Sequence, residues 1–127
     1  MDSDLQAFLA SWEATLVGRD PEGAADLYSR DPKPTVVFSD GARAHDWLDV
    51  RVRLGRDFER TIIKRVSHHH VAVQHLDGHA VLSLDYDLHA SDLWGQPRVA
   101  GRTATFVLTM TKDGWRIVHA HFALAHK

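Results

Sequence analysis

The residue with the clearest potential for acid–base chemistry is Asp40, which follows the short apolar segment 35–38. At the mouth of a pocket, its carboxylate could act as a general base toward a bound substrate. Aspartate before glycine is also common turn chemistry, because its side chain hydrogen-bonds the local backbone. The sequence Ser39-Asp40-Gly41 therefore leaves two alternatives open, a general base and a turn residue.

Two histidines, His119 and His121, stand two residues apart in a predicted strand over 115–124, so both rings share one face of that strand. A two-residue Asp-Gly loop before the strand places them on the apolar, cavity-side face, where they would contact a ligand. A three-residue Lys-Asp-Gly loop with a glycine bulge shifts the pairing by one residue and places them on the threonine side. In that register the histidines mark a subunit interface. We favour it because it buries the apolar side chains Val118, Ala120, Phe122 and Leu124.

A second group of histidines, at 68–70, raises the question of a metal site. Histidines at positions i and i+2 of a strand can share a zinc or copper ion. The chain has no cysteine, and no nearby glutamate completes a known ligand spacing. We therefore expect no metal and no other cofactor, and interpret this segment as a solvated or interface strand. A histidine-bound metal enzyme is kept as a third hypothesis.

Large side chains at core spacing are the candidate contacts for an apolar ligand. In a fold with an incomplete core, such side chains line a cavity as well as filling the interior. Arg102 lies on the otherwise apolar side of its predicted strand, a position that implies a partner carboxylate or an anionic ligand. The aromatic candidates are Trp12, Tyr28, Trp47, Phe58, Tyr86 and Phe106.

The composition limits the class of protein. A chain of 127 residues is the size of one domain, which we place over residues 1–127. A net charge of −2 without a run of like charges argues against nucleic-acid binding. No apolar run reaches membrane-spanning length, and the N-terminus lacks the basic start and apolar stretch of a signal peptide. We therefore expect a cytoplasmic protein with no nucleic-acid or membrane partner.

The spacing of apolar residues predicts three helices in the N-terminal half. The first begins with a capping box at Ser3 and ends at Gly18, where glycine can take a left-handed backbone. The second starts after an Asp20 cap, and the third covers roughly residues 44–58. A short strand at 35–38 lies between the second and third helices.

Alternating apolar and polar residues predict four long strands in the C-terminal half, at 65–76, 79–90, 99–111 and 115–124. Helices followed by a meander of strands indicate an α+β fold, with the helices packed on one face of an antiparallel sheet. Each strand has one apolar face, so we expect the sheet to curl around the helices.

Three segments resemble the nuclear transport factor 2-like superfamily, which includes ketosteroid isomerases, SnoaL-like polyketide cyclases and the association domain of calcium/calmodulin-dependent kinase. Residues 12–28 are similar to the family's opening pair of helices, which ends in Leu-Tyr. Residues 36–41 resemble its short strand and turn, and residues 113–121 its Asp-Gly-x-Trp-x-Ile-Val-His-x-His ending. The resemblance implies a cone-shaped fold, in which three N-terminal helices pack on a curved, mostly antiparallel sheet.

Carried over residue by residue, the resemblance to the isomerases covers only part of their site. Their general base corresponds to Asp40, or less closely to Ser39. Their oxyanion-hole tyrosine falls at Trp12, whose indole N–H can donate a hydrogen bond. Their protonated aspartic acid falls at Phe106, which cannot donate one. We therefore do not expect this chain to be an isomerase of that type.

The resemblance and these residues together predict a SnoaL-like protein that binds a small, largely apolar organic molecule. If it is an enzyme, the expected reaction is proton transfer, as in isomerisation, cyclisation or dehydration. Asp40 would then be the base, with Trp12, Tyr86 and Arg102 as positioning groups. The alternative is a non-catalytic ligand-binding or oligomerisation module. In either case we expect a homodimer formed through the threonine-rich outer face of the sheet.

Overall fold

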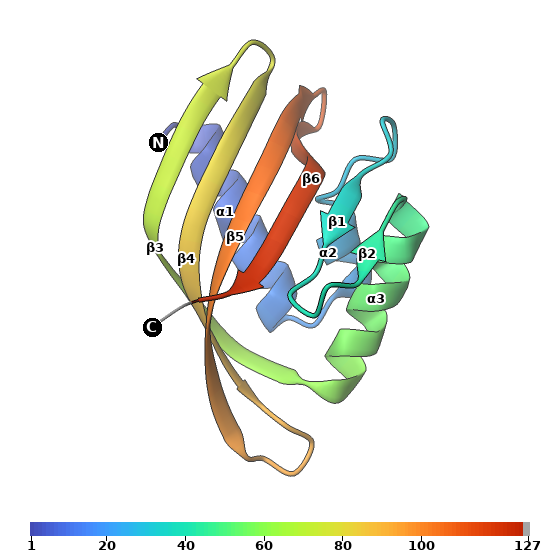
Figure 1. The fold of residues 1–127 in the computed structure, drawn as a ribbon, viewed down its shortest axis with the longest axis vertical. Coiled ribbons are helices and arrows are strands. Elements are labelled where there is room, and N and C mark those ends of the chain that lie inside the picture. Colours follow the sequence, from blue (N-terminus) through green and yellow to red (C-terminus); the bar gives the residue numbers. More distant parts are fainter. Residues whose placement is uncertain (126–127) are drawn as a thin grey trace.

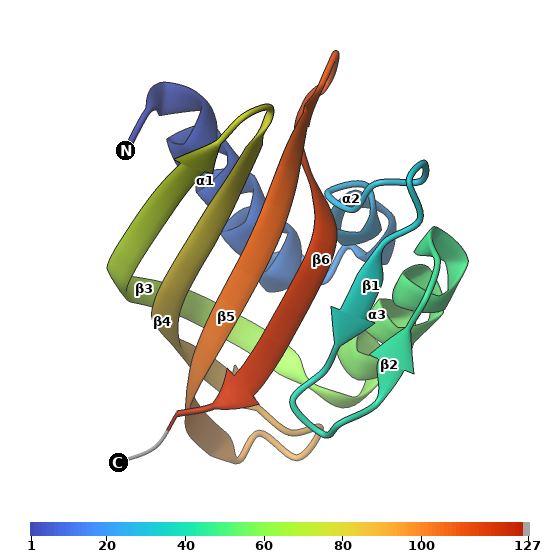
Figure 2. The ribbon, with the colours of Figure 1, turned by 45° about the horizontal axis from the view of Figure 1, so that its top comes forward.

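A six-stranded sheet and three helices form the two layers of the protein (Figures 1 and 2), in a computed structural model that describes residues 1–125. The order of strands is β2-β1-β6-β5-β4-β3, and the helices all lie against one face of the sheet. The strands are β1 (Thr35–Val37), β2 (Arg43–Ala44), β3 (Ile62–Leu76), β4 (His79–Ser91), β5 (Pro97–Thr111) and β6 (Gly114–Leu124). The predicted α+β class, with helices on a curved sheet, is confirmed.

Only one pair of strands in the described part of the chain is parallel. β1 runs alongside β6 in the same direction, and every other pair is antiparallel. β2 was missing from the sequence prediction, because a two-residue strand carries too few residues for a period of two to appear. Ala44, the second residue of β2, stands where the predicted third helix was expected to begin.

Three helices precede the long strands, as the apolar spacing predicts: α1 (Ser3–Val17), α2 (Pro21–Ala25) and α3 (Trp47–Arg60). Asp20 caps α2 as expected, with its side chain accepting the N–H of Gly23. The third helix begins later than predicted, because the carboxylate of Asp46 caps it by accepting the N–H of Asp49 at 2.8 Å. No helix among residues 1–125 is both long enough and apolar enough to cross a membrane.

The ends of α1 differ from the prediction. Its N-cap is Asp2 rather than Ser3, and the Asp2 carboxylate accepts the N–H of Leu5 at 2.8 Å. At the other end Gly18 keeps a right-handed backbone with φ −73°, and Arg19 takes the left-handed conformation with φ 51°. The Arg19 side chain donates to the carbonyl of Phe58, which joins the end of α1 to α3.

The register between β5 and β6 combines a short turn with a bulge. Lys112 and Asp113 form a two-residue turn, which Thr111 and Gly114 close as a pair. Three residues further along the ladder, Leu108 pairs with Ile117. The pairing then shifts by one residue at Val118, and Phe106 lies opposite Ala120. Beyond this bulge the strands have the register that the sequence analysis favours.

The bulge decides which side chains of β6 point toward the helices. Ile117 and Ala120 are fully buried, so Ile117 takes the inward place that was predicted for Val118. Leu124 was also predicted to be buried and is instead 60% exposed, because it lies at the open end of the strand. His119 and His121 lie opposite Val107 and Thr105 on the outer face.

The core lies between α1 and the inner face of the sheet. Phe106 is fully buried at its centre, with Phe8 packed edge-on at 5.7 Å between ring centroids. Around it, Leu108 on the same strand and Leu82 and Ile117 on the two neighbouring strands are fully buried. This layer supports the floor of the cavity that opens beside it.

Candidate functional site

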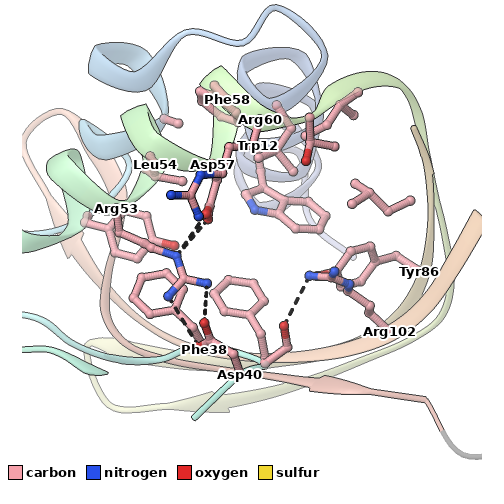
Figure 3. A pocket seen from close by; sticks show the side chains of 18 residues that line it. Trp12, Phe38, Asp40, Arg53, Leu54, Asp57, Phe58, Arg60, Tyr86 and Arg102 are labelled. Atoms are coloured by element: carbon pink, nitrogen blue, oxygen red, sulfur yellow. Dashed lines mark hydrogen bonds and ion pairs between the residues drawn. The ribbon is translucent and has the colours of Figure 1, made fainter. Parts of the chain in front are cut away.

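A cavity of about 370 Å³ opens between the helices and the inner face of the sheet. Figure 3 shows the side chains that line it, with the rings of Trp12, Phe58 and Tyr86 and the charged groups of Asp40, Arg53 and Arg102 around one space. The apolar wall consists of Trp12, Leu16, Ala24, Tyr28, Phe38, Leu54, Phe58, Ile63, Tyr86, Leu88 and Phe122. The polar groups are Ser39, Asp40, Arg53, Asp57, Arg60, Thr61 and Arg102. Its volume lies within the range of about 300–1,000 Å³ that is usual for small-molecule sites.

Trp12 forms the floor of the cavity. It follows Leu5, Phe8 and Leu9 on the buried stripe of α1, so the helix points its indole ring at the sheet. The ring packs edge-on against Tyr86 at 5.1 Å and against Phe106 at 5.5 Å between centroids. These contacts hold the indole rigidly and present an aromatic surface to a ligand.

Arg102 brings a positive charge into this aromatic cavity. It stands opposite Tyr86 in the β4–β5 ladder, and its Nη1 donates to the hydroxyl of Ser39 at 3.3 Å. Its Nε is buried and has no hydrogen-bond partner within residues 1–125. No carboxylate of these residues lies within the 4.0 Å of an ion pair with it. The guanidinium is therefore a hydrogen-bond donor with unused capacity.

Arg53 on α3 behaves differently, because it is held by two carboxylates. Its Nε lies 2.9 Å from Asp57 Oδ2, and its Nη2 lies 3.0 Å from Asp40 Oδ2. Its guanidinium also stacks over Phe38, with 4.3 Å from Cζ to the ring centroid. The charge of Arg53 is thus neutralised within the protein, in contrast to that of Arg102.

Asp40 occupies the rim of the cavity as a turn residue. Its Oδ1 accepts the N–H of Ala42 at 3.0 Å, and its side chain is 59% exposed. This backbone hydrogen bond and the ion pair with Arg53 hold the pKa of Asp40 below its usual value. The carboxylate is therefore ionised at neutral pH, the form that accepts a proton, while its proton affinity is reduced.

Two tyrosine hydroxyls complete the polar chemistry of the wall. Burial raises the pKa of Tyr28, and the nearby Tyr86 raises it further. Burial also raises the pKa of Tyr86, and the adjacent Arg102 offsets this only in part. Both side chains thus remain neutral at physiological pH and can donate hydrogen bonds to a ligand oxygen.

The structure brings together six of the ten predicted site residues in this one wall: Trp12, Tyr28, Asp40, Phe58, Tyr86 and Arg102. Phe106 was predicted to contact the ligand but does not line the cavity, because it is fully buried beneath Trp12 and Phe122. His119 and His121, which would contact a ligand only in the less favoured register, do not line the cavity. The β6 bulge turns these two side chains to the outer face of the sheet.

Trp47 was also predicted to contact the ligand and instead joins two helices. Its indole N–H donates to the carbonyl of Ala25 at 2.9 Å, which links α3 to the end of α2. The guanidinium of Arg30 stacks over the ring, 3.6 Å from its centroid. The N–H edge and one face of this indole are thus used in packing outside the cavity.

The sequence analysis did not identify Arg53 and Asp57 as site residues. A signal was present, because Val50, Arg53, Leu54, Asp57 and Phe58 follow the i, i+3, i+4, i+7, i+8 spacing of one helix face. The two charged residues lie between the apolar members of this face and therefore point toward the same side of the helix.

Comparison with known proteins supports the fold. No family model matches the chain, and no curated protein matches it in sequence. A putative calcium/calmodulin-dependent protein kinase II association domain from Xanthomonas campestris is similar in structure, with a TM-score of 0.85 and 19% identity over 98% of this chain and 87% of that one. A putative dehydratase of the NTF2-like family from Streptomyces avermitilis gives 0.84 and 13% identity, over 98% of this chain and 96% of that one. A ketosteroid isomerase-like protein from Erwinia carotovora atroseptica gives 0.82 and 13% identity over the full length of both.

These similarities confirm the predicted resemblance at the level of the fold. The chain has the nuclear transport factor 2-like fold, with its helices and curved sheet in the expected order. At such low identities one fold carries many functions, so the function must be argued from the cavity.

Proposed function

We propose that this protein, which has the nuclear transport factor 2-like fold, binds a small and largely apolar organic molecule that carries a carboxylate. The apolar wall would hold the body of the ligand, and Arg102 would hold the carboxylate. The observation that carries this proposal is the guanidinium of Arg102, which has no carboxylate partner in residues 1–125 although it lies in an aromatic cavity.

The free-energy cost of holding the Arg102 guanidinium away from water without an anionic partner supports the proposal. A charged side chain removed from water is unfavourable unless it is paired and hydrogen-bonded. A carboxylate about 4 Å from the guanidinium gains roughly 4 kcal/mol at an effective dielectric of 20, before its own desolvation is counted. Ser39 and Tyr86 lie beside Arg102 and can hold its fork in position for two parallel hydrogen bonds.

The remaining wall favours an aromatic or aliphatic body. Trp12, Phe58 and Leu88 enclose the cavity from α1, α3 and β4 respectively. Burial of apolar ligand surface there contributes about 25 cal/mol per Å². Specificity would then rest on the position of the carboxylate relative to the apolar part of the ligand.

The test is a calorimetric titration with 2-naphthoate of the natural protein and of two variants. Arg102→Met should weaken binding about tenfold or more, because a hydrogen bond to a charged group is worth roughly 1.5–3 kcal/mol. Arg98→Met is the matched control, since Arg98 lies on the same strand, is exposed and pairs with Asp92 outside the cavity. Equal affinity in all three proteins would contradict the proposal.

Proton transfer is a second candidate function, and the position of Asp40 favours it. Asp40 lines the same cavity as Arg102 and the neutral hydroxyl of Tyr86. A carbonyl oxygen held by these two donors would be stabilised as it gains negative charge, while Asp40 removes a proton from the adjacent carbon. The reduced proton affinity of Asp40 weakens it as a base, so ligand binding is the primary proposal.

We also propose that the outer face of the sheet pairs with a second copy of the chain. The side chains of Thr103, Thr105 and Val107 form a half-buried row there, and His119 and His121 stand beside them on β6. This row is made of uncharged and weakly polar side chains, which suits the core of a homodimer interface. Thr105→Lys should therefore shift the molecular mass measured by light scattering from that of a dimer to that of a monomer.

A further inference from the structure

Two histidines and one aspartate converge on the outer face of the sheet where β3 pairs with β4. His69, His70 and Asp85 each offer one ligand atom, and these atoms lie within 4.8 Å of one another. His70 Nδ1 is 3.0 Å from Asp85 Oδ2, and the two imidazole rings are 4.9 Å apart between centroids. This arrangement brings three metal-ligating groups together from two strands.

Consecutive residues of a regular strand point to opposite faces, so His69 and His70 should lie on opposite sides of the sheet. A bulge changes this, because the β3–β4 pairing shifts between His69 and Ala72. His70 takes a left-handed backbone with φ 52°, a conformation that is uncommon outside glycine. The irregular backbone turns the second imidazole toward the same carboxylate that His69 faces across the ladder.

We propose that His69, His70 and Asp85 bind a first-row transition-metal dication, with zinc as the best fit. Two imidazole nitrogens and one carboxylate oxygen are ligands that zinc accepts, and a water molecule would take the fourth position. Zinc bonds to nitrogen at about 2.0–2.1 Å, so the three ligand atoms must approach one another further. The His70 side chain is 78% exposed and the Asp85 side chain 41%, which leaves both free to rotate inward.

The sequence alone does not reveal this set, because the third ligand comes from another strand. Asp85 is 15 residues from His70 in the chain and becomes its neighbour only through the β3–β4 ladder. The neighbouring histidines have separate partners on the helix side of the sheet. His68 pairs with Glu13 on α1, and His75 lies 3.8 Å from Asp2 at the start of that helix.

The position of the site indicates a structural role. Asp85 points outward, whereas the next residue, Tyr86, points into the cavity. β3 is an edge strand of the described sheet, and a bound ion would tie it to β4. An ion that binds only the folded state raises its stability, so the melting temperature should report occupancy.

The experiment is a titration of tag-free, chelator-treated protein with zinc chloride, followed by calorimetry and by thermal melting. We expect one zinc ion per chain and a rise in melting temperature, with magnesium chloride giving no rise because Mg²⁺ prefers oxygen ligands. Asp85→Asn and His70→Asn should each abolish both effects. Asparagine also tolerates the left-handed backbone at position 70, so the second variant should keep the bulge.

His75→Asn is the matched control, because it removes an exposed histidine of the same strand whose partner is on the helix side. It should bind zinc as the natural protein does. Two results would overturn the proposal: no binding at millimolar zinc, or zinc binding that survives in Asp85→Asn. His70→Asn and His75→Asn together show whether a loss of zinc binding comes from the missing ligand or from damage to the strand.

Discussion

Arg102 and Tyr86 stand directly opposite each other on β5 and β4, and both point into the cavity. The pair places a cation and a neutral hydroxyl side by side, with the hydroxyl of Ser39 3.3 Å from the guanidinium. A single oxygen anion of a ligand could accept hydrogen bonds from more than one of these groups. The proposed binding of small carboxylates depends on that pair.

The first prediction concerns the stability of the protein without ligand. Arg102→Met should leave the free energy of unfolding unchanged or raise it by about 1 kcal/mol, because it removes a partly buried charge that has no ion-pair partner. Arg53→Met is the comparison, and it should lower the free energy of unfolding by about 1 kcal/mol, because it leaves Asp57 without its partner. Urea denaturation of both variants measures the difference. A large loss of stability in Arg102→Met would mean that its charge is satisfied within the protein.

The second prediction concerns the two tyrosines, which are the only ones in the chain and both line the cavity. Burial raises both pKa values, so the folded protein should show less tyrosinate absorbance at pH 10, the usual midpoint, than the unfolded chain does. Their folded pKa values are raised, so the stability that they contribute is present below pH 10 and is lost as the pH rises further. Half ionisation at pH 10 in the folded protein would contradict the burial of both hydroxyls.

In the same titration, Arg102→Met should delay the ionisation of Tyr86. The guanidinium lowers the pKa of Tyr86 against the larger effect of burial. Its removal therefore leaves burial unopposed, and the midpoint should move to higher pH. Arg98→Met should leave the titration curve unchanged.

The third prediction concerns the ionisation of Asp40. An NMR titration should place its midpoint below the usual 3.8, because the amide of Ala42 and the guanidinium of Arg53 stabilise the carboxylate. Arg53→Met should move this midpoint upward. Since the folded pKa is lowered, the contribution of Asp40 to stability is present above about pH 4 and is lost as the pH falls below it. An unchanged midpoint in Arg53→Met would show that the ion pair with Arg53 does not lower the pKa of Asp40.

The fourth prediction separates the wall of the cavity from the packing around it. Trp47→Phe should lower the free energy of unfolding by about 1 kcal/mol, since it removes the hydrogen bond to Ala25. It should leave the affinity for 2-naphthoate unchanged. Trp12→Leu should weaken that affinity, because the indole forms the cavity floor. Isothermal titration with both variants tests the assignment, and a loss of affinity in Trp47→Phe would contradict it.

Much of the fold could be predicted from the sequence, because strong periodicity survives tertiary packing. The strand at 79–90 alternates without interruption, and β4 covers His79–Ser91. The helix boundaries were less predictable, because several caps compete within a few residues. Asp2 caps α1 in place of the adjacent Ser3, since its carboxylate also interacts favourably with the helix dipole.

The site was less predictable than the fold, for two physical reasons. The bulge at Val118 arises where two strands adjust to each other, and local turn chemistry does not determine it. Side chains at core spacing can also serve different purposes once packed: Trp12 lines the cavity, whereas Trp47 binds a backbone carbonyl of the preceding helix. Only the three-dimensional arrangement distinguishes these two tryptophans.

The most direct test of the central claim compares 2-naphthoate with 2-naphthamide on the natural protein by isothermal titration calorimetry. The two molecules share an apolar body, and only the first carries a negative charge. Naphthoate should bind about tenfold or more tightly than the amide, because Arg102 gains a charged hydrogen-bond partner. Equal affinities, or tighter binding of the amide, would contradict the assignment of Arg102 as the group that selects the ligand.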